Sequence, residues 1–129
     1  MNGNVLLDTT IVVAHLRGDA ALTAKLEQSN ALYLPLTALG ELYYGAYRSK
    51  NPPKGLAQIR EFLKAVVILH PGETTADNYG QIKAALAQAG TPVPQNDIWI
   101  AALATEYQLP LAARDDHFKS VSGLNLLAW

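Results

Sequence analysis

The fold is decided by Asn4-Val5-Leu6-Leu7-Asp8-Thr9-Thr10-Ile11-Val12-Val13, where a short apolar run ends at a single carboxylate. Val5 to Leu7 show no polar alternation, which is typical of a strand buried on both faces. Thr9 or Thr10 can cap a following helix, so Asp8 is predicted at the carboxyl end of the first strand. Ligands bind at that edge in open α/β sheets. Helix initiation alone also explains one Asp here, so its meaning depends on whether other acids reach the same edge.

Composition limits the classes of protein that this chain can belong to. It has 129 residues, of which 50% are hydrophobic and 16% charged, and this predicts a single globular domain over residues 1–129. There is no cysteine, which excludes disulfides and thiolate metal sites and fits a cytoplasmic location. The net charge of −1 gives no overall basic footprint, so binding of nucleic acid requires a local patch. No apolar run approaches the roughly 20 residues that span a membrane.

Strand and helix patterns alternate along the chain. Because this alternation is typical of a parallel sheet with helices on both faces, the predicted fold class is α/β, a three-layer α/β/α sandwich. The prolines at 92 and 94 exclude helix between 91 and 94, and residues 49–55 are predicted as a loop. Strands are predicted at 5–7, 31–34, 65–69, 109–113 and 124–128, and helices at 10–17, 20–28, 36–48, 56–64, 74–89 and from Asn96 or Asp97.

The helix at 36–48 carries a second acid. Thr37, Glu41, Gly45 and Arg48 are spaced by four and three residues and therefore share one face. Glycine in mid-helix costs about 1 kcal/mol relative to alanine, so Gly45 indicates that something approaches closely. A solvated Glu41 that pairs with Arg48 is the plainer alternative.

Two further acids are predicted at the same edge of the sheet. Asn96 and Asp97 stand together where a helix begins, although a helix needs only one cap. Asp115 follows the strand at 109–113, as Asp8 follows the first, and either it or Asp116 can cap the next turn. Glu41 lies near the start of the helix that follows the second strand. Right-handed crossovers would bring all four acids, Asp8, Glu41, Asp97 and Asp115, to one crevice.

Such a crevice requires a cation. Carboxylates in close proximity repel one another and have raised pKa values unless a positive charge is present. Oxygen ligands without cysteine or paired histidine favour Mg²⁺ or Mn²⁺ over zinc, and such ions support displacement at phosphorus. No Gly-x-Ser-x-Gly, Walker or Gly-x-Gly-x-x-Gly motif is present. His117 can contact a substrate from beside Asp115, but local packing or capping is the more ordinary interpretation.

Four segments in order resemble the PIN-domain ribonucleases, most closely the VapC-type toxins of bacterial toxin–antitoxin pairs. The first segment is Leu7-Asp8-Thr9-Thr10 with a following Leu-Arg-Gly, and the second is Glu41-Leu42-Tyr43-Tyr44-Gly45 with Ser49. The third is Asn96-Asp97-Ile98-Trp99-Ile100-Ala101-Ala102-Leu103-Ala104, and the fourth is Arg114-Asp115-Asp116-His117-Phe118 with Gly123-Leu124. Each segment alone is weak evidence, but four at matching separations are strong.

The resemblance implies a parallel sheet of strand order 3-2-1-4-5 and a Mg²⁺- or Mn²⁺-dependent endoribonuclease. It implies that Asp8, Glu41, Asp97 and Asp115 are both catalytic and metal-binding, with Asp8 and Asp97 the surest ligands, and that Thr9 hydrogen-bonds within the site. Cleavage would leave a 5′-phosphate and a 3′-hydroxyl. The resemblance also implies a homodimer and a small VapB-like antitoxin partner. The candidates for contacts with RNA, chosen on location, are Arg17, Arg48, Lys50, Lys54, Arg114 and Lys119.

One departure from the family pattern keeps other functions open. Ala113 stands where the family often has Thr or Ser, so a hydroxyl that could order a ligand or water is missing. A metal-binding but inactive PIN module that acts in regulation or protein interaction is therefore an alternative. A phospho-acceptor signalling domain is a second one. It fits less well, because Asp8 has no paired acid beside it and residues 124–129 contain no lysine.

Overall fold

The computed structural model describes residues 2–129 and contains a five-stranded parallel sheet. Its strand order is β3-β2-β1-β4-β5, which confirms the predicted α/β fold and order. Leu6 pairs with Tyr33 on one side and with Leu111 on the other, so β1 is the central strand. The strands are β1 (Asn2–Leu7), β2 (Ser29–Pro35), β3 (Val67–Leu69), β4 (Leu111–Ala112) and β5 (Leu126–Leu127).

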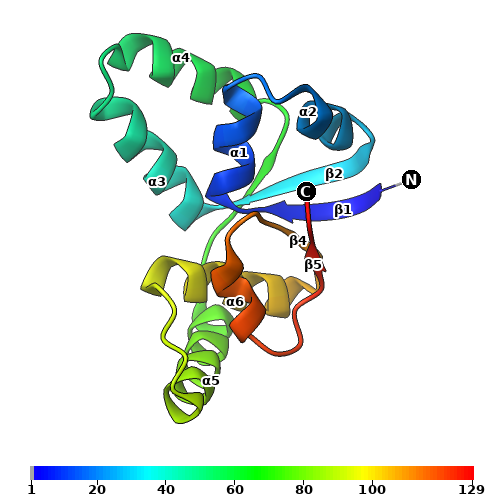
Figure 1. The fold of residues 1–129 in the computed structure, drawn as a ribbon, viewed down its shortest axis with the longest axis vertical. Coiled ribbons are helices and arrows are strands. Elements are labelled where there is room, and N and C mark those ends of the chain that lie inside the picture. The colour runs from blue at the N-terminus through cyan, green and yellow to red at the C-terminus, as the bar shows by residue number, and fades with distance from the viewer. Residues whose placement is uncertain (1) are drawn as a thin grey trace.

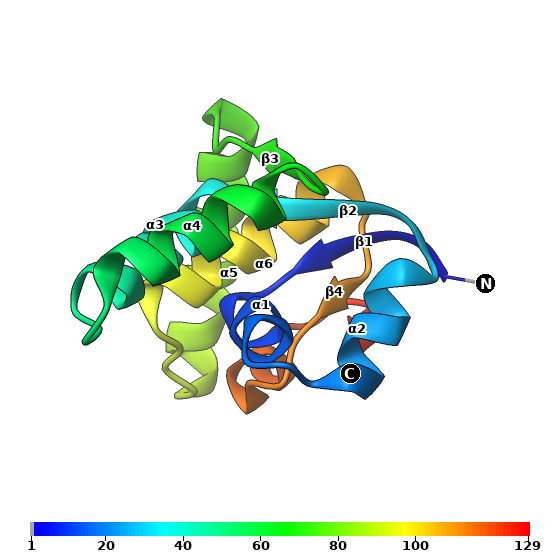
Figure 2. The same cartoon turned by 90° about the horizontal axis from the view of Figure 1, so that it is seen from above.

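Helices cover both faces of this sheet. Figure 1 shows α1, α2, α3 and α4 on one side and α5 and α6 on the other, and Figure 2 shows the first group from above. This confirms the three-layer sandwich. The helices are α1 (Thr9–Leu16), α2 (Ala20–Glu27), α3 (Leu36–Tyr47), α4 (Pro52–Leu63), α5 (Glu73–Ala89) and α6 (Gln95–Tyr107), followed by the 3-10 helix η1 (Asp116–Ser120). None of the described helices is both long and apolar enough to cross a membrane.

The core is built around β1 and α6. Val5, Leu6 and Leu7 are buried, as expected of a strand covered on both faces. Ala101 and Ala102 of α6 are fully buried, and their small side chains let the helix pack closely on the sheet. The central strand and this helix therefore hold the residues at their ends, Asp8 and Asp97, in fixed positions.

The predicted strands at 65–69, 109–113 and 124–128 are shorter in the structure, and the starts of several predicted helices are wrong. Capping explains three of these helix starts. Asp8 itself caps α1, because its side chain accepts a hydrogen bond from the Thr10 N–H. The predicted loop at 49–55 ends early because Asn51 caps α4, whose first positions are prolines that need no N–H donor there. Neither Asn96 nor Asp97 caps α6, since the helix begins one residue earlier with Pro94 at its N-cap.

No part of the described chain makes the close approach that Gly45 is expected to indicate, so an approach by another molecule stays a prediction. A methyl group on Gly45 would meet no atom of the described chain within 4 Å, apart from its own helix backbone and neighbours. The close approach lies instead at Gly55 of α4, where an added Cβ would be 3.1 Å from Cβ of Ala46. Gly55 therefore lets α4 pack against α3, whereas Gly45 borders open space.

Gly45→Ala and Gly40→Ala are expected to raise the free energy of unfolding by about 0.5–1 kcal/mol each, because both positions are exposed and open in α3. Gly55→Ala serves as the contrast, since its methyl group meets Ala46 and the helix-propensity gain is offset. Urea unfolding followed by circular dichroism measures all three. A loss of stability in Gly45→Ala would show that the space beside it is filled.

Candidate active site

Asp8 lies at the carboxyl end of β1 and is only 2% exposed. Its Oδ2 accepts hydrogen bonds from the Thr10 hydroxyl at 2.6 Å and from the Thr10 N–H at 3.3 Å. Burial raises the pKa of the Asp8 carboxyl, the bonds from Thr10 lower it in part, and the charge of Asp115 adds to the rise. Asp8 thus starts α1 and also lies within electrostatic reach of a second acid.

Asp97 is the third residue of α6 and is 8% exposed. Because it does not cap the helix, its carboxylate is free to make another contact, and Oδ2 lies 3.0 Å from Nδ1 of His117. Burial raises the pKa of Asp97 to about 6, with Asp8 and Asp115 adding to the rise and His117 opposing it. A carboxylate in this position needs a positive charge nearby to be stable at neutral pH.

His117 lies between two of the acids. Its Nδ1 is 3.0 Å from Asp97 and 2.8 Å from Oδ1 of Asp115, which also accepts a hydrogen bond from the His117 backbone N–H and so caps η1. The hydrogen bond to Asp97, with further help from Asp115, raises the pKa of His117. The candidate ligand atoms of Asp97, Asp115 and His117 all lie within 4.8 Å of one another.

The contacts of His117 with Asp97 and Asp115 differ from the local packing or capping that was the more ordinary interpretation of this residue. The sequence signal was its place two residues after Asp115. Its contact with Asp97 depends on the fold, because that residue lies on another element.

Glu41 completes the acidic cleft. The Thr9 hydroxyl donates a 2.9 Å hydrogen bond to its Oε1, so the expected bond of Thr9 within the site is present. An open cleft of about 540 Å³ is lined by Glu41, Asp97, Asp115 and His117 together with residues 94–96. The fold therefore brings three of the four predicted acids to one cleft, with Asp8 buried within charge range of Asp97 and Asp115.

Arg114, for which contact with RNA is predicted, makes three side-chain contacts within the chain. Its guanidinium pairs with Asp19 at 2.9 Å and donates to the carbonyl of Trp129 at 3.0 and 3.2 Å. Its backbone N–H donates to the Thr10 hydroxyl at 3.2 Å, which ties the loop after β4 to the start of α1. Arg114 therefore ties the loop after β4 to α1, to Asp19 and to Trp129, which follows β5, and its contact with RNA stays a prediction.

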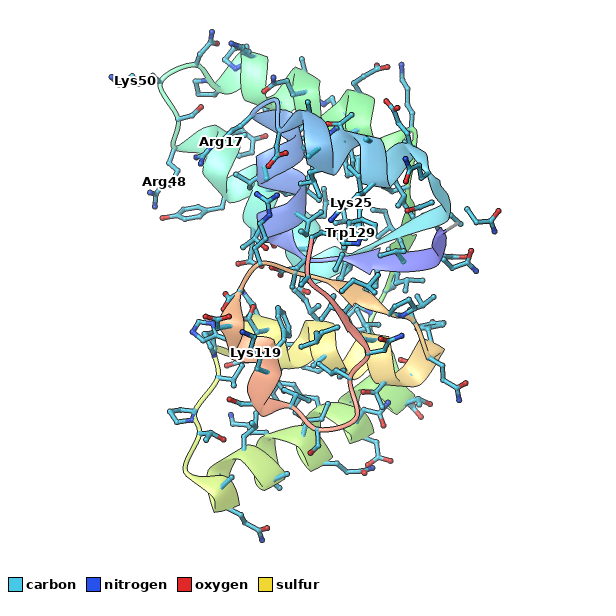
Figure 3. All side chains as sticks on the ribbon, turned by 45° about the vertical axis from the view of Figure 1, so that its right-hand side comes forward. Arg17, Lys25, Arg48, Lys50, Lys119 and Trp129 are labelled. Atoms are coloured by element: carbon cyan, nitrogen blue, oxygen red, sulfur yellow. The ribbon has the colours of Figure 1, made fainter. Side chains whose placement is uncertain are left out.

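The other predicted RNA contacts divide into two groups. Figure 3 shows Arg17, Arg48 and Lys50 around the end of α3 and the loop that leads to α4. Arg48 lies over the ring of Tyr44, with 5.3 Å to the centroid, and Lys54 is exposed nearby at the start of α4. Lys119 lies on η1 instead, where it pairs with Asp116 at 2.9 Å. Among these predicted contacts, the basic side chains that form no salt bridge within residues 2–129 thus lie around α3 and the start of α4.

Comparison with known proteins identifies the family. The model of the PIN domain matches residues 5–124. Over 127 residues, covering 96% of each chain, the protein is 32% identical to ribonuclease VapC2 of Haemophilus influenzae and 31% identical to the tRNA(fMet)-specific endonuclease VapC of Shigella flexneri. A chain in the crystal structure of DNA-bound VapBC from Salmonella typhimurium superposes with a TM-score of 0.90 at 26% identity and 98% coverage of both chains. The protein therefore belongs to the PIN-domain family of nucleases, together with the VapC ribonucleases.

Proposed function

We propose that this protein is a Mg²⁺- or Mn²⁺-dependent endoribonuclease and the toxin of a VapBC-type toxin–antitoxin pair. The observation that carries the proposal is the group formed by Asp97, Asp115 and His117, which lines one open cleft together with Glu41. The cleft lies where the strand order reverses between β1 and β4, the usual ligand site in such sheets. RNA is proposed as the substrate because the relatives are named as ribonucleases and as a tRNA(fMet)-specific endonuclease.

The donor set fits a divalent cation. Asp97 and Asp115 supply hard carboxylate oxygens, which suit Mg²⁺ and Mn²⁺, and His117 would offer a nitrogen ligand beside them only after its ring has released the proton that these acids favour. The resemblance implies Asp8 and Asp97 as the surest ligands, but Asp115 lines the cleft beside Asp97 and Asp8 does not. We therefore propose that Asp97 and Asp115 hold the ion, with Asp8 and Glu41 contributing directly or through water. A bound ion would balance the carboxylates, orient a phosphodiester and make water a better nucleophile.

The remaining contacts of the site would position these groups. Thr9 fixes the Glu41 carboxylate, and Thr10 fixes Asp8 through two hydrogen bonds. Both threonines lie in the first turn of α1, so one helix start orients two acids. Glu41 is then a candidate to accept a proton from a water in the cleft, because it lines the same cleft but is not one of the grouped ligands.

The partners proposed are RNA, a VapB-like antitoxin and a second copy of this chain, in the cytoplasm. Tyr44 and Tyr47 of α3 are 66% and 64% exposed, and large exposed aromatic side chains favour protein contacts. We propose that this end of α3 contributes to the antitoxin interface.

Asp97→Asn is expected to lower RNA cleavage by about 100-fold or more, because it removes a charged ligand of the ion. Purified protein is incubated with total cellular RNA and Mn²⁺ or Mg²⁺, and the fragments are resolved and end-mapped. Asp116→Asn is the matched control, since that acid is exposed and paired with Lys119 outside the cleft. Cleavage that survives in Asp97→Asn or in chelator would contradict the proposed function. Metal binding without cleavage by the wild type would favour the inactive PIN module suggested by Ala113.

The same variant is expected to stabilise the metal-free fold. The raised pKa of Asp97 means that its charged form is disfavoured in the folded state. Removing the charge at neutral pH is therefore expected to raise the free energy of unfolding by about 1 kcal/mol, or the Tm by a few degrees. Thermal unfolding in chelator compares wild type with Asp97→Asn. Mn²⁺ is expected to raise the Tm of the wild type more than that of the variant. A variant that unfolds at lower temperature than the wild type in chelator would show that the carboxylate is already fully compensated.

The homodimer is tested by light scattering. We expect the mass of a dimer at micromolar concentrations, because Leu36, Val67 and Tyr107 are further large apolar side chains exposed on the single chain. The Tyr44→Ser and Tyr47→Ser double variant separates the two interfaces, since it is expected to weaken antitoxin binding and leave the dimer intact. A monomeric wild type would contradict the dimer.

A further inference from the structure

The first turn of α6 places two amide side chains beside the acidic groups. The helix begins with Gln95 and Asn96, directly before Asp97, and both amide residues line the open cleft of about 540 Å³. Both are exposed. Further along the helix, Ala101 and Ala102 are fully buried and fix α6 against the sheet. The two amides therefore border the cleft from a backbone that is held in place.

The fold makes no use of these two amides. Asparagine at a helix start is most common as the N-cap, where its side chain accepts a hydrogen bond from a backbone N–H. Pro94 is the N-cap here. Neither Gln95 nor Asn96 makes a side-chain hydrogen bond within residues 2–129. Asparagine inside a helix is also less favourable than alanine, so helix formation does not account for Asn96.

The amides are the neutral hydrogen-bonding side chains of the cleft. Its other polar side chains are those of Glu41, Asp97, Asp115 and His117, which are ionisable and suit a cation with its phosphate ligand. An amide offers two donor hydrogens and one acceptor oxygen without a charge. Among the parts of a nucleotide, the edge of a base presents the same combination of neutral donors and acceptors. The two amides therefore fit a base better than a phosphate.

We propose that Gln95 and Asn96 bind the edge of a base next to the cut phosphodiester and thereby set the sequence preference of cleavage. The inference rests on the proposed function and extends it to substrate recognition. Single-stranded RNA is read through splayed bases that are hydrogen-bonded at their edges. Because Asn96 directly precedes Asp97 in one helix, the recognised base would lie at a constant position relative to the cut.

The size of the cleft allows a base to lie beside the phosphodiester. Its volume of about 540 Å³ falls within the roughly 300–1,000 Å³ of ligand pockets. One water takes about 30 Å³ of liquid volume, so an ion with a few waters leaves most of the cleft free. The remaining space adjoins the two amides, because they line the same cleft.

The test compares where RNA is cut by the wild type, by Asn96→Ala and by the double variant that also carries Gln95→Ala. The substrate is a synthetic RNA with a randomised single-stranded stretch, incubated with Mn²⁺, and sequencing of the fragment ends gives the base frequencies around the cut. We expect the double variant to reduce the preference at one flanking position by about tenfold, the value of one base contact through two hydrogen bonds. Gln88→Ala is the matched control, because Gln88 is an exposed amide of α5 outside the cleft, and its preference is expected to equal that of the wild type.

Two further measurements separate base recognition from a change in the helix start. Circular dichroism verifies that each variant is folded, and calorimetry measures its affinity for Mn²⁺. A displaced helix start would move Asp97, weaken Mn²⁺ binding and slow all cuts alike, whereas loss of a base contact changes the preference at unchanged Mn²⁺ affinity. An unchanged base preference in the double variant would overturn the proposal. A double variant that keeps the preference but newly cuts a 2′-deoxy substrate would also overturn it, since the amides would then contact the ribose.

A binding experiment distinguishes failure of this proposal from failure of the nuclease function. Asp97→Asn serves as the parent protein, so that bound RNA is not cut, and fluorescence anisotropy measures binding of short labelled RNAs made of A, C or U alone. Affinities that differ in the parent and become equal in the double variant would uphold base recognition. If the wild type then cuts no RNA, the nuclease function is rejected and the base contact stands. Equal affinities in the parent, or differences that the double variant retains, would overturn the proposal.

Discussion

Repulsion among carboxylates at one edge of the sheet is the constraint on which the site depends. Asp8 and Asp97 are buried, Asp115 lies within charge range of both, and burial raises the pKa of the two buried acids. Carboxylates are kept in such a place only where a positive charge compensates them. His117 provides part of that compensation, since its Nδ1 lies 3.0 Å from Asp97 and 2.8 Å from Asp115 and its pKa is raised. A divalent cation would provide compensation of higher charge at the same place.

The fold explains how these acids meet. β1 lies at the centre of the sheet between β2 and β4, so Asp8 and the loop after β4 occupy neighbouring positions at the strand ends. The contact between Thr10 and the Arg114 backbone N–H joins the two loops, and the Arg114 side chain braces the second one through Asp19 and Trp129. α6 brings Asp97 to the same edge from the opposite layer (Figure 1). Buried small residues in α6 fix its position, and hence that of the carboxylate.

Much of this arrangement could be predicted from patterns local in sequence. Alternating strands and helices predict the layers, and acids at strand ends predict the edge that carries the site. Contacts between distant segments could not be predicted. His117 meets Asp97 from 20 residues away, and Arg114 meets Asp19 from 95 residues away, so no spacing rule indicates either pair. The start of α6 could not be predicted for a related reason. Pro94 is the N-cap of α6 and makes no side-chain hydrogen bond to it. Asp97 is therefore available to the site, whereas the pair Asn96-Asp97 suggested that one of the two caps the helix.

Glycine was equally ambiguous in sequence. Gly45 and Gly55 are both helical, yet only Gly55 is required by packing against Ala46. A glycine in mid-helix is compatible with a neighbouring helix or with free space, and only the fold distinguishes the two. Gly45 borders a cavity that shares Glu41 with the acidic cleft, so the space beside it adjoins the chemistry.

The most direct test of the central claim is a crystal structure of the protein soaked in Mn²⁺, with anomalous diffraction data. An anomalous peak is expected between the carboxylates of Asp97 and Asp115, in the cleft that Glu41 faces. The same soak of Asp97→Asn is expected to show no peak there. An empty cleft in the wild type, or an ion bound only elsewhere on the surface, would contradict the claim that these acids are gathered to hold a cation.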